Sequence, residues 1–108
     1  SKRDWGHAKD YVEAMWLMLQ REKPEDFVIG TGKEYSVKDF AQKAFECVGL
    51  NYEDYIIINK NLIRPSEVTT LIADYSKAKK ILNWESKINF NSLVEEMVES
   101  DLKLVTDY

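Results

Sequence analysis

Apolar residues recur every three or four positions in four segments of the chain, which is the spacing of amphipathic helices. The segments are residues 7–20, 35–50, 75–84 and 89–105. In the first segment Trp16 widens the apolar stripe, so we expect that helix to be buried against more than one neighbour. The stripe of the first segment comprises Ala8, Tyr11, Val12, Met15, Met18 and Leu19.

Residue types at the ends of these segments support the helix predictions. Ser36 precedes the second apolar stripe and Asp39 follows three positions later, as in a capping box. Gly49 is placed to end the same helix, and Asn89 is placed to cap the last one. Cys47 falls among apolar residues of the second helix, where we expect a small buried side chain.

Three shorter apolar runs predict strands. Phe27, Val28 and Ile29 form a continuous run that ends at Gly30 and Gly32, which predicts a short, well-buried strand. Residues 54–59 and, more weakly, 69–74 predict two more. Helices that alternate with strands predict an α/β fold. Three strands are too few for a complete doubly wound sheet, so we expect the chain to form part of a larger α/β protein.

Composition and charge exclude several classes of protein. The chain has 108 residues, a formal net charge of -4 and an isoelectric point near 5.0, which argues against a nucleic-acid-binding domain. A single cysteine excludes a disulfide-stapled scaffold. No apolar run approaches the roughly 18 residues of a membrane span, and the first residues are polar, so we expect no membrane and a cytoplasmic location.

The candidate binding residues are two arginines and a glutamate. Arg64 and Glu67 lie in the stretch NLIRPSEV, and Arg3 precedes Asp4 and Trp5. A guanidinium group suits phosphate oxygens, and a carboxylate accepts hydrogen bonds from the paired hydroxyls of a ribose. These residues therefore predict a nucleotide site, although a solvated loop with an exposed ion pair would also account for Arg64 and Glu67.

Other chemistry is not supported by the sequence. Gly30 and Gly32 lack the third glycine of a dinucleotide-binding fingerprint, and no Cys/His spacing suits a metal. His7 is the only histidine, and it has no context of a catalytic triad. Tyr75 and Lys79 have the spacing Tyr-x-x-x-Lys, which we attribute to chance.

Several segments together resemble one family of enzymes. The stretch RDWGHAKDYVEAMWLML, the loop RPSEV and the closing segments DYSKAKKILNW and NFNSLVEEMVESDLKLV are similar, in this order, to the GDP-mannose 4,6-dehydratases. These enzymes are extended short-chain dehydrogenases/reductases. The resemblance runs from about Lys2 to Val105 and implies that residues 1–108 are the C-terminal, substrate-binding portion of such an enzyme. The fold class it implies is α/β, with mixed helices and short strands in an incomplete Rossmann fold.

The resemblance also implies a reaction and partners. The family binds NADP in an N-terminal Rossmann domain, which this chain lacks. It converts GDP-mannose to GDP-4-dehydro-6-deoxy-mannose, a precursor of GDP-fucose and other deoxysugars. Residues matching Arg3 and Arg64 contact the diphosphate and the residue matching Glu67 contacts the ribose, whereas Ile63 stands where the family often has an aromatic residue. We expect the whole enzyme to be a homo-oligomeric lyase.

The same resemblance implies that this chain alone is inactive, because the cofactor loop and the catalytic Tyr-x-x-x-Lys belong upstream. We expect the first helix and the run at Phe27–Ile29 to pack against the Rossmann domain. Two alternatives stay open: another nucleotide-sugar dehydratase or epimerase, and a non-catalytic interaction module.

Overall fold

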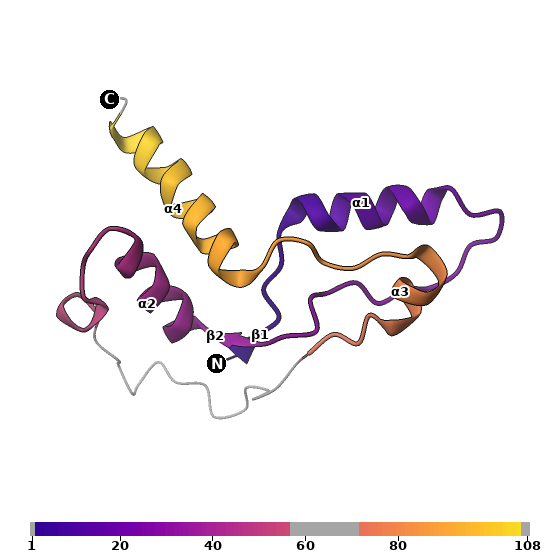
Figure 1. Ribbon diagram of the computed structural model, residues 1–108, viewed down its shortest axis with the longest axis horizontal. Coiled ribbons are helices and arrows are strands. Elements are labelled where there is room, and N and C mark those ends of the chain that lie inside the picture. Colours follow the sequence, from indigo (N-terminus) through magenta and orange to yellow (C-terminus); the bar gives the residue numbers. More distant parts are fainter. Residues whose placement is uncertain (1, 57–71, 107–108) are drawn as a thin grey trace.

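Helices make up most of the computed structural model, which describes residues 2–56 and 72–106 (Figure 1). Strand β1 pairs antiparallel with β2, with Lys2 opposite Ser36 and Arg3 opposite Tyr35. The elements follow one another as β1 (Lys2–Arg3), α1 (Ala8–Leu19), β2 (Tyr35–Ser36), α2 (Val37–Cys47), the 3-10 helix η1 (Tyr52–Asp54), α3 (Ser76–Leu82) and α4 (Phe90–Thr106). No described helix is long and apolar enough to cross a membrane.

The helices form two groups on either side of the short β1–β2 ladder (Figure 1). Helix α1 packs against α3, and α2 packs against α4. The arrangement is flat, with extents of 53 × 40 × 19 Å and a radius of gyration of 17.1 Å. A compact protein of this length would have a radius of gyration of about 13 Å. The described residues therefore spread their core over two small clusters.

The first cluster lies between α1 and α3 and is centred on Trp84. Ala14, Ala78 and Trp84 are almost fully buried there. Small residues on both helices let them approach closely, and the Trp84 ring fills the space beside them. The Trp84 Nε1–H donates to the backbone oxygen of Asp10 at 2.9 Å, so the buried ring has a partner for its polar atom.

The Asp10 side chain links this cluster to the segment that follows α3. Its side chain is only 3% exposed, and its Oδ2 accepts from the backbone N–H groups of Lys87 at 3.1 Å and Ile88 at 3.0 Å. The Ser86 hydroxyl donates to the same oxygen at 3.2 Å. The connection between α3 and α4 is therefore held on the first turn of α1.

The second cluster is largely aromatic and joins β2, α2 and α4. The rings of Tyr35 and Phe90 stack with centroids 4.0 Å apart, and those of Trp5 and Phe40 are 4.9 Å apart. Leu93 and Val94 are buried beneath them on α4.

The predicted helix ends are confirmed where the structure describes them. Ser36 Oγ accepts from the Asp39 N–H at 2.9 Å, and Asp39 Oδ2 accepts from the Ser36 N–H at 2.9 Å, which forms a complete capping box. Gly49 follows α2 with a φ of +74°, a conformation that glycine adopts without strain. Asn89 Oδ1 accepts from the Ser92 N–H at the start of α4.

The strand predictions are wrong in the described part of the chain. Residues 24–29 form an extended connection rather than a strand, and Val28 is 55% exposed. A strand needs a neighbouring backbone to pair with, and in residues 2–56 and 72–106 only β1 and β2 provide one another with such a partner. Residues 54–56 belong to η1 and the turn after it, and residues 72–74 are irregular. Residues 57–59 and 69–71 lie outside the described residues.

One prediction about burial is also corrected. Cys47 is exposed at the end of α2, where it lines an open hollow between α2 and α4. Among the described helices α1 packs against α3, and its predicted contact with an N-terminal Rossmann domain stays a prediction. In this arrangement Val12, Met15, Trp16 and Leu19 are 59–80% exposed, and the face of α1 that is buried carries Asp10 and Ala14.

Candidate functional site

Arg3 is the one predicted binding residue that the structure describes. It lies in β1, is partly buried, and pairs through its backbone with Tyr35 of β2. Its Nη1 donates to the backbone oxygen of Lys2 at 2.8 Å. Arg64 and Glu67 lie outside the described residues, so their distances from Arg3 stay a prediction.

Asp4, directly after Arg3, holds two distant segments together. Its Oδ1 accepts from the Thr31 backbone N–H at 3.0 Å and from the Thr31 hydroxyl at 2.6 Å. Its Oδ2 accepts from the Gly32 N–H at 3.1 Å and the Ala73 N–H at 3.2 Å. The carboxylate thus joins β1, the loop before β2 and the approach to α3.

Gly30 and Gly32 allow these segments to approach closely. A side-chain carbon at Gly30 would lie 2.3 Å from the Cβ of Ala73, and one at Gly32 would lie 2.9 Å from the Tyr75 ring. Gly32 also has a φ of +75°. The glycines therefore face packed side chains, and the next helix, α2, begins only after β2 rather than directly after them, so its N-terminus is not at this loop. Gly30 and Gly32 therefore serve the packing of this junction.

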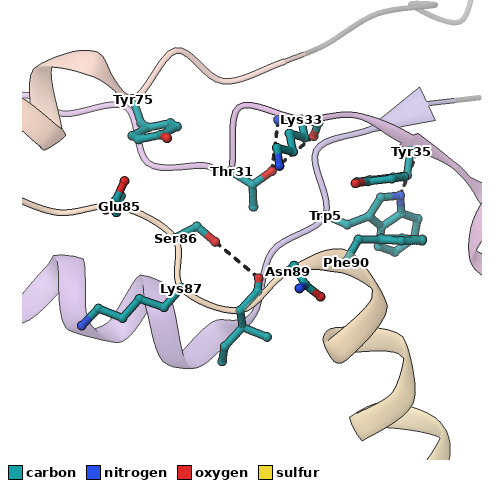
Figure 2. Close-up of a pocket in the computed structure, with 11 residues that line it drawn as sticks. Trp5, Thr31, Lys33, Tyr35, Tyr75, Glu85, Ser86, Lys87, Asn89 and Phe90 are labelled. Atoms are coloured by element: carbon teal, nitrogen blue, oxygen red, sulfur yellow. Dashed lines mark hydrogen bonds between the residues drawn. The ribbon is translucent and has the colours of Figure 1, made fainter.

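A polar cavity of about 260 Å³ lies next to this junction. Trp5, Tyr35 and Phe90 gather at one end of it, and Tyr75 lies at the other (Figure 2). Ser86 lines its wall, and the Ser86 hydroxyl is within donating distance of the Asp10 carboxylate and of the backbone oxygen of Ile88. The remaining lining residues are Thr31, Lys33, Glu85, Lys87, Ile88 and Asn89.

Two charged groups of this cavity, Lys87 and Glu85, are paired with other parts of the protein. Lys87 Nζ pairs with Glu13 at 3.0 Å, and Glu85 pairs with Lys79 at 3.2 Å. The Tyr75 ring packs edge-on against Trp84 with centroids 5.9 Å apart. These contacts give Tyr75 and Lys79 structural partners, and the interpretation of their Tyr-x-x-x-Lys spacing as chance stays a prediction.

His7 also has a structural role. Its Nδ1 accepts from the Lys9 N–H at 3.0 Å at the start of α1, which leaves Nε2 as the protonated nitrogen that donates to Glu96 at 2.9 Å. Among residues 2–56 and 72–106 no group of three or more His, Cys, Asp and Glu side chains could hold a metal.

The environment of Tyr11 combines burial and negative charge. Partial burial, followed by the charges of Asp4 and Asp10, raises the pKa of the Tyr11 hydroxyl. Both effects disfavour the phenolate, so Tyr11 stays neutral and is unsuited to act as a base.

Comparison with known proteins identifies the family. A family profile described as GDP-mannose 4,6 dehydratase matches residues 1–97 of the chain. The chain belongs to the GDP-mannose 4,6-dehydratase family. It is 52% identical to GDP-mannose 4,6 dehydratase 1 of Arabidopsis thaliana over 96% of the chain and 29% of that relative. It is 43% identical to the GDP-mannose 4,6 dehydratase of Homo sapiens over 97% of the chain and 33% of that relative. The chain thus spans about a third of the length of these curated relatives.

A solved structure supports the fold class. The crystal structure of UDP-glucose 4-epimerase from Thermotoga maritima with UDP-glucose has a TM-score of 0.83 and 30% sequence identity. The match covers 96% of this chain and 32% of that one. This confirms the predicted fold class, a part of the α/β fold of an extended short-chain dehydrogenase/reductase.

The sequence did not reveal the structural role of two carboxylates, Asp4 and Asp10, which accept several hydrogen bonds each. An acidic residue in the first turn of a helix usually faces solvent, so Asp10 would be expected at the surface. Asp4 is distinguished in the sequence only by its place next to Arg3. The sequence carries no signal for the burial of Asp10, since this residue lies opposite the wide apolar stripe, on the side that periodicity assigns to solvent.

Proposed function

We propose that residues 1–108 are the C-terminal, substrate-binding portion of a GDP-mannose 4,6-dehydratase. The whole enzyme, a lyase, would convert GDP-mannose to GDP-4-dehydro-6-deoxy-mannose on the route to GDP-fucose and related deoxysugars. The observation that carries this proposal is the match of the family profile to residues 1–97, together with 52% identity to the Arabidopsis enzyme.

In this proposal, one part of the enzyme binds the cofactor and another binds the substrate. The chain spans about a third of its relatives, and the cofactor NADP would be bound by a Rossmann domain N-terminal to the part that this chain represents. NADP supplies hydride transfer when it is bound there. The residues of this chain would bind and orient the nucleotide part of the substrate. We further propose a cytoplasmic, homo-oligomeric enzyme.

Three residues would hold the GDP part of the substrate. Arg3 and Arg64 would bind the diphosphate, and Glu67 would accept hydrogen bonds from the ribose hydroxyls. The position of Arg3 supports this assignment, because its strand is anchored through Asp4 to Ala73, which follows the segment with Arg64 and Glu67.

A hybrid enzyme tests the proposal. This chain would replace the matching segment of the Arabidopsis relative, and the hybrid would be incubated with GDP-mannose and NADP. We expect a product that is lighter than GDP-mannose by one water, detected by mass spectrometry. The 108-residue chain alone, in the same assay, should form none. A soluble, correctly folded hybrid without product, or a product from the chain alone, would contradict the proposal.

Another nucleotide-sugar enzyme is the second candidate, because the solved structure with a similar fold is an epimerase crystallised with UDP-glucose. Binding of GDP and UDP to the hybrid, compared by calorimetry, separates the two. Preference for GDP supports the dehydratase, and preference for UDP supports the alternative.

A further inference from the structure

The polar cavity beside the loop before β2 is lined by three side-chain groups that have no partner within residues 2–56 and 72–106. They are the Lys33 ammonium group and the hydroxyl groups of Tyr35 and Tyr75. The two hydroxyl groups point toward the middle of the cavity from its two ends (Figure 2). In the described part of the chain the one fully buried side-chain oxygen without a partner belongs to Glu34, so all three groups are accessible to a ligand.

Packing fixes the rings of both tyrosines. The Tyr35 ring stacks on Phe90 with centroids 4.0 Å apart. The Tyr75 ring meets Trp84 edge-on at 5.9 Å, and Trp84 is almost fully buried. The hydroxyl groups therefore have defined positions before any ligand arrives, and a ligand that bonds to them orders little that is not already ordered.

The loop that carries Lys33 is also held in place. The Thr31 hydroxyl donates to Asp4 Oδ1 at 2.6 Å and accepts from the Lys33 backbone N–H at 3.2 Å. The Gly32 N–H donates to Asp4 Oδ2 at 3.1 Å. Asp4 does not line the cavity, and its carboxylate is occupied by these donors. The backbone at Lys33 is thus fixed at the edge of the cavity.

Lys33 supplies the charge of the cavity that is left over after pairing. Lys87 Nζ pairs with Glu13 at 3.0 Å, and Lys79 Nζ pairs with Glu85 at 3.2 Å, so two of the charged lining residues are neutralised by neighbours. Among the described lining residues only the Lys33 ammonium group has no such counter-charge. The cavity therefore favours an anion.

The size and lining of the cavity define the ligand further. Its volume of about 260 Å³ is below the roughly 300–1,000 Å³ of pockets for drug-sized ligands, so the ligand is small. Tyrosine hydroxyl groups both donate to and accept from the hydroxyl groups of a ligand, and an ammonium group binds phosphate or carboxylate oxygens. The aromatic end at Trp5 and Phe90 suits the apolar face of a sugar ring.

We propose that this cavity binds a small hydroxylated anion, either a sugar monophosphate or a sugar acid. Lys33 binds the anionic group, and Tyr35 and Tyr75 bind hydroxyl groups at the two ends. This inference goes beyond the proposed function and does not depend on it, because Arg3 does not line the cavity and all the residues that the inference uses lie in the described part of the chain.

The experiment measures binding of four probes to the folded hybrid enzyme by calorimetry: glucose 6-phosphate, gluconate, glucose and inorganic phosphate. Only the first two combine a charge with several hydroxyl groups. We expect at least one of them to bind roughly tenfold more tightly than glucose and inorganic phosphate. Whichever binds more tightly identifies phosphate or carboxylate as the anionic group. The inference is wrong if neither binds, or if glucose or inorganic phosphate binds as tightly.

Three variants test the assigned groups with the tighter probe. Lys33→Met removes the charge at an exposed position and should weaken binding by roughly tenfold or more. Tyr35→Phe and Tyr75→Phe keep the ring contacts and remove only the hydroxyl groups, so each should weaken binding by about two- to tenfold. The melting temperatures should stay close to that of the unmodified hybrid. Unchanged affinity in all three variants would overturn the inference.

Two further variants are controls. Lys23→Met removes the same charge from an exposed position that does not line the cavity, and Arg3→Ala removes the residue predicted to bind the diphosphate. Both should bind the probe as the unmodified hybrid does. The inference fails if Lys23→Met weakens binding as much as Lys33→Met, or if Arg3→Ala abolishes it. Product formation from GDP-mannose reports on the proposed function separately, so either can fail alone.

Discussion

At the scale of single residues, the protein uses buried or partly buried carboxylates as connectors. Asp4 and Asp10 each bind backbone donors from segments about 30 to 80 positions away along the chain. Such bonds are strong because the acceptor is charged, and losing one partner leaves backbone donors without an acceptor. These hydrogen bonds hold in place the segments that connect the helices.

Arg3 allows a test of the proposed diphosphate contact at the same scale. A diphosphate lies far from the sugar carbons that react, so its contacts are similar in the ground and transition states. We expect Arg3→Ala and Arg64→Ala in the hybrid to raise KM by about one to two decades, equivalent to roughly 1.5–3 kcal/mol, with little change in kcat.

Conservative substitutions serve as controls for these alanine variants. Arg64→Lys should restore part of the binding, because it keeps the charge but loses the planar fork of donors. Glu67→Gln should cost less than Arg64→Ala, since an amide still accepts a hydrogen bond from a ribose hydroxyl. A large loss of kcat with KM unchanged would show that the arginines act elsewhere than on the nucleotide.

At the scale of elements, α2 depends on its N-terminal capping box. Both hydrogen bonds between Ser36 and Asp39 are 2.9 Å long. Ser36→Ala removes the acceptor for the Asp39 N–H, and we expect a loss of about 1 kcal/mol in the free energy of unfolding. Urea denaturation followed by circular dichroism measures it, and Ser92→Ala on α4, whose side chain does not cap that helix, is the comparison.

The same capping box predicts a dependence of stability on pH. The hydrogen bond from the Ser36 backbone N–H holds the pKa of the Asp39 carboxyl below its ordinary value. The unfolded chain therefore takes up this proton at a higher pH than the folded one, so the stabilisation is present above the unfolded pKa. It is lost as the pH falls through the folded pKa. Asp39→Asn should flatten this acid-side decline, and an unchanged slope would contradict the assignment.

At the scale of the whole molecule, the flat shape leaves one face of α1 uncovered. Val12, Met15, Trp16 and Leu19 are exposed side by side at helical spacing. Contiguous apolar surface of this kind favours association. We expect this chain to form dimers or larger species as its concentration rises, measured by light scattering.

Substitutions on this face provide the control. Trp16→Glu and Leu19→Glu should shift the chain toward monomer, whereas Val105→Glu, at an equally exposed site on α4, should not. A wild-type chain that stays monomeric at high concentration and binds no apolar dye would overturn the expectation.

The sequence by itself determined the four helices, both caps of α2, the N-cap of α4, and the family. Helical periodicity and capping are local properties, and they were sufficient for Ser36, Gly49 and Asn89. The motifs around Arg3 and Arg64 were specific enough to indicate the GDP-mannose 4,6-dehydratases, which the family match confirms.

Tertiary structure alone decided which apolar residues are buried and which polar residues hold the fold. The run Phe27–Ile29 has the composition of a strand but is not one here, because strand formation requires a partner backbone and not only apolar side chains. Trp16 and Leu19 are exposed while Asp10 is buried, because the helix turns toward α3 the face with the small residue Ala14. Neither outcome can be read from periodicity, since both depend on which segments meet in space.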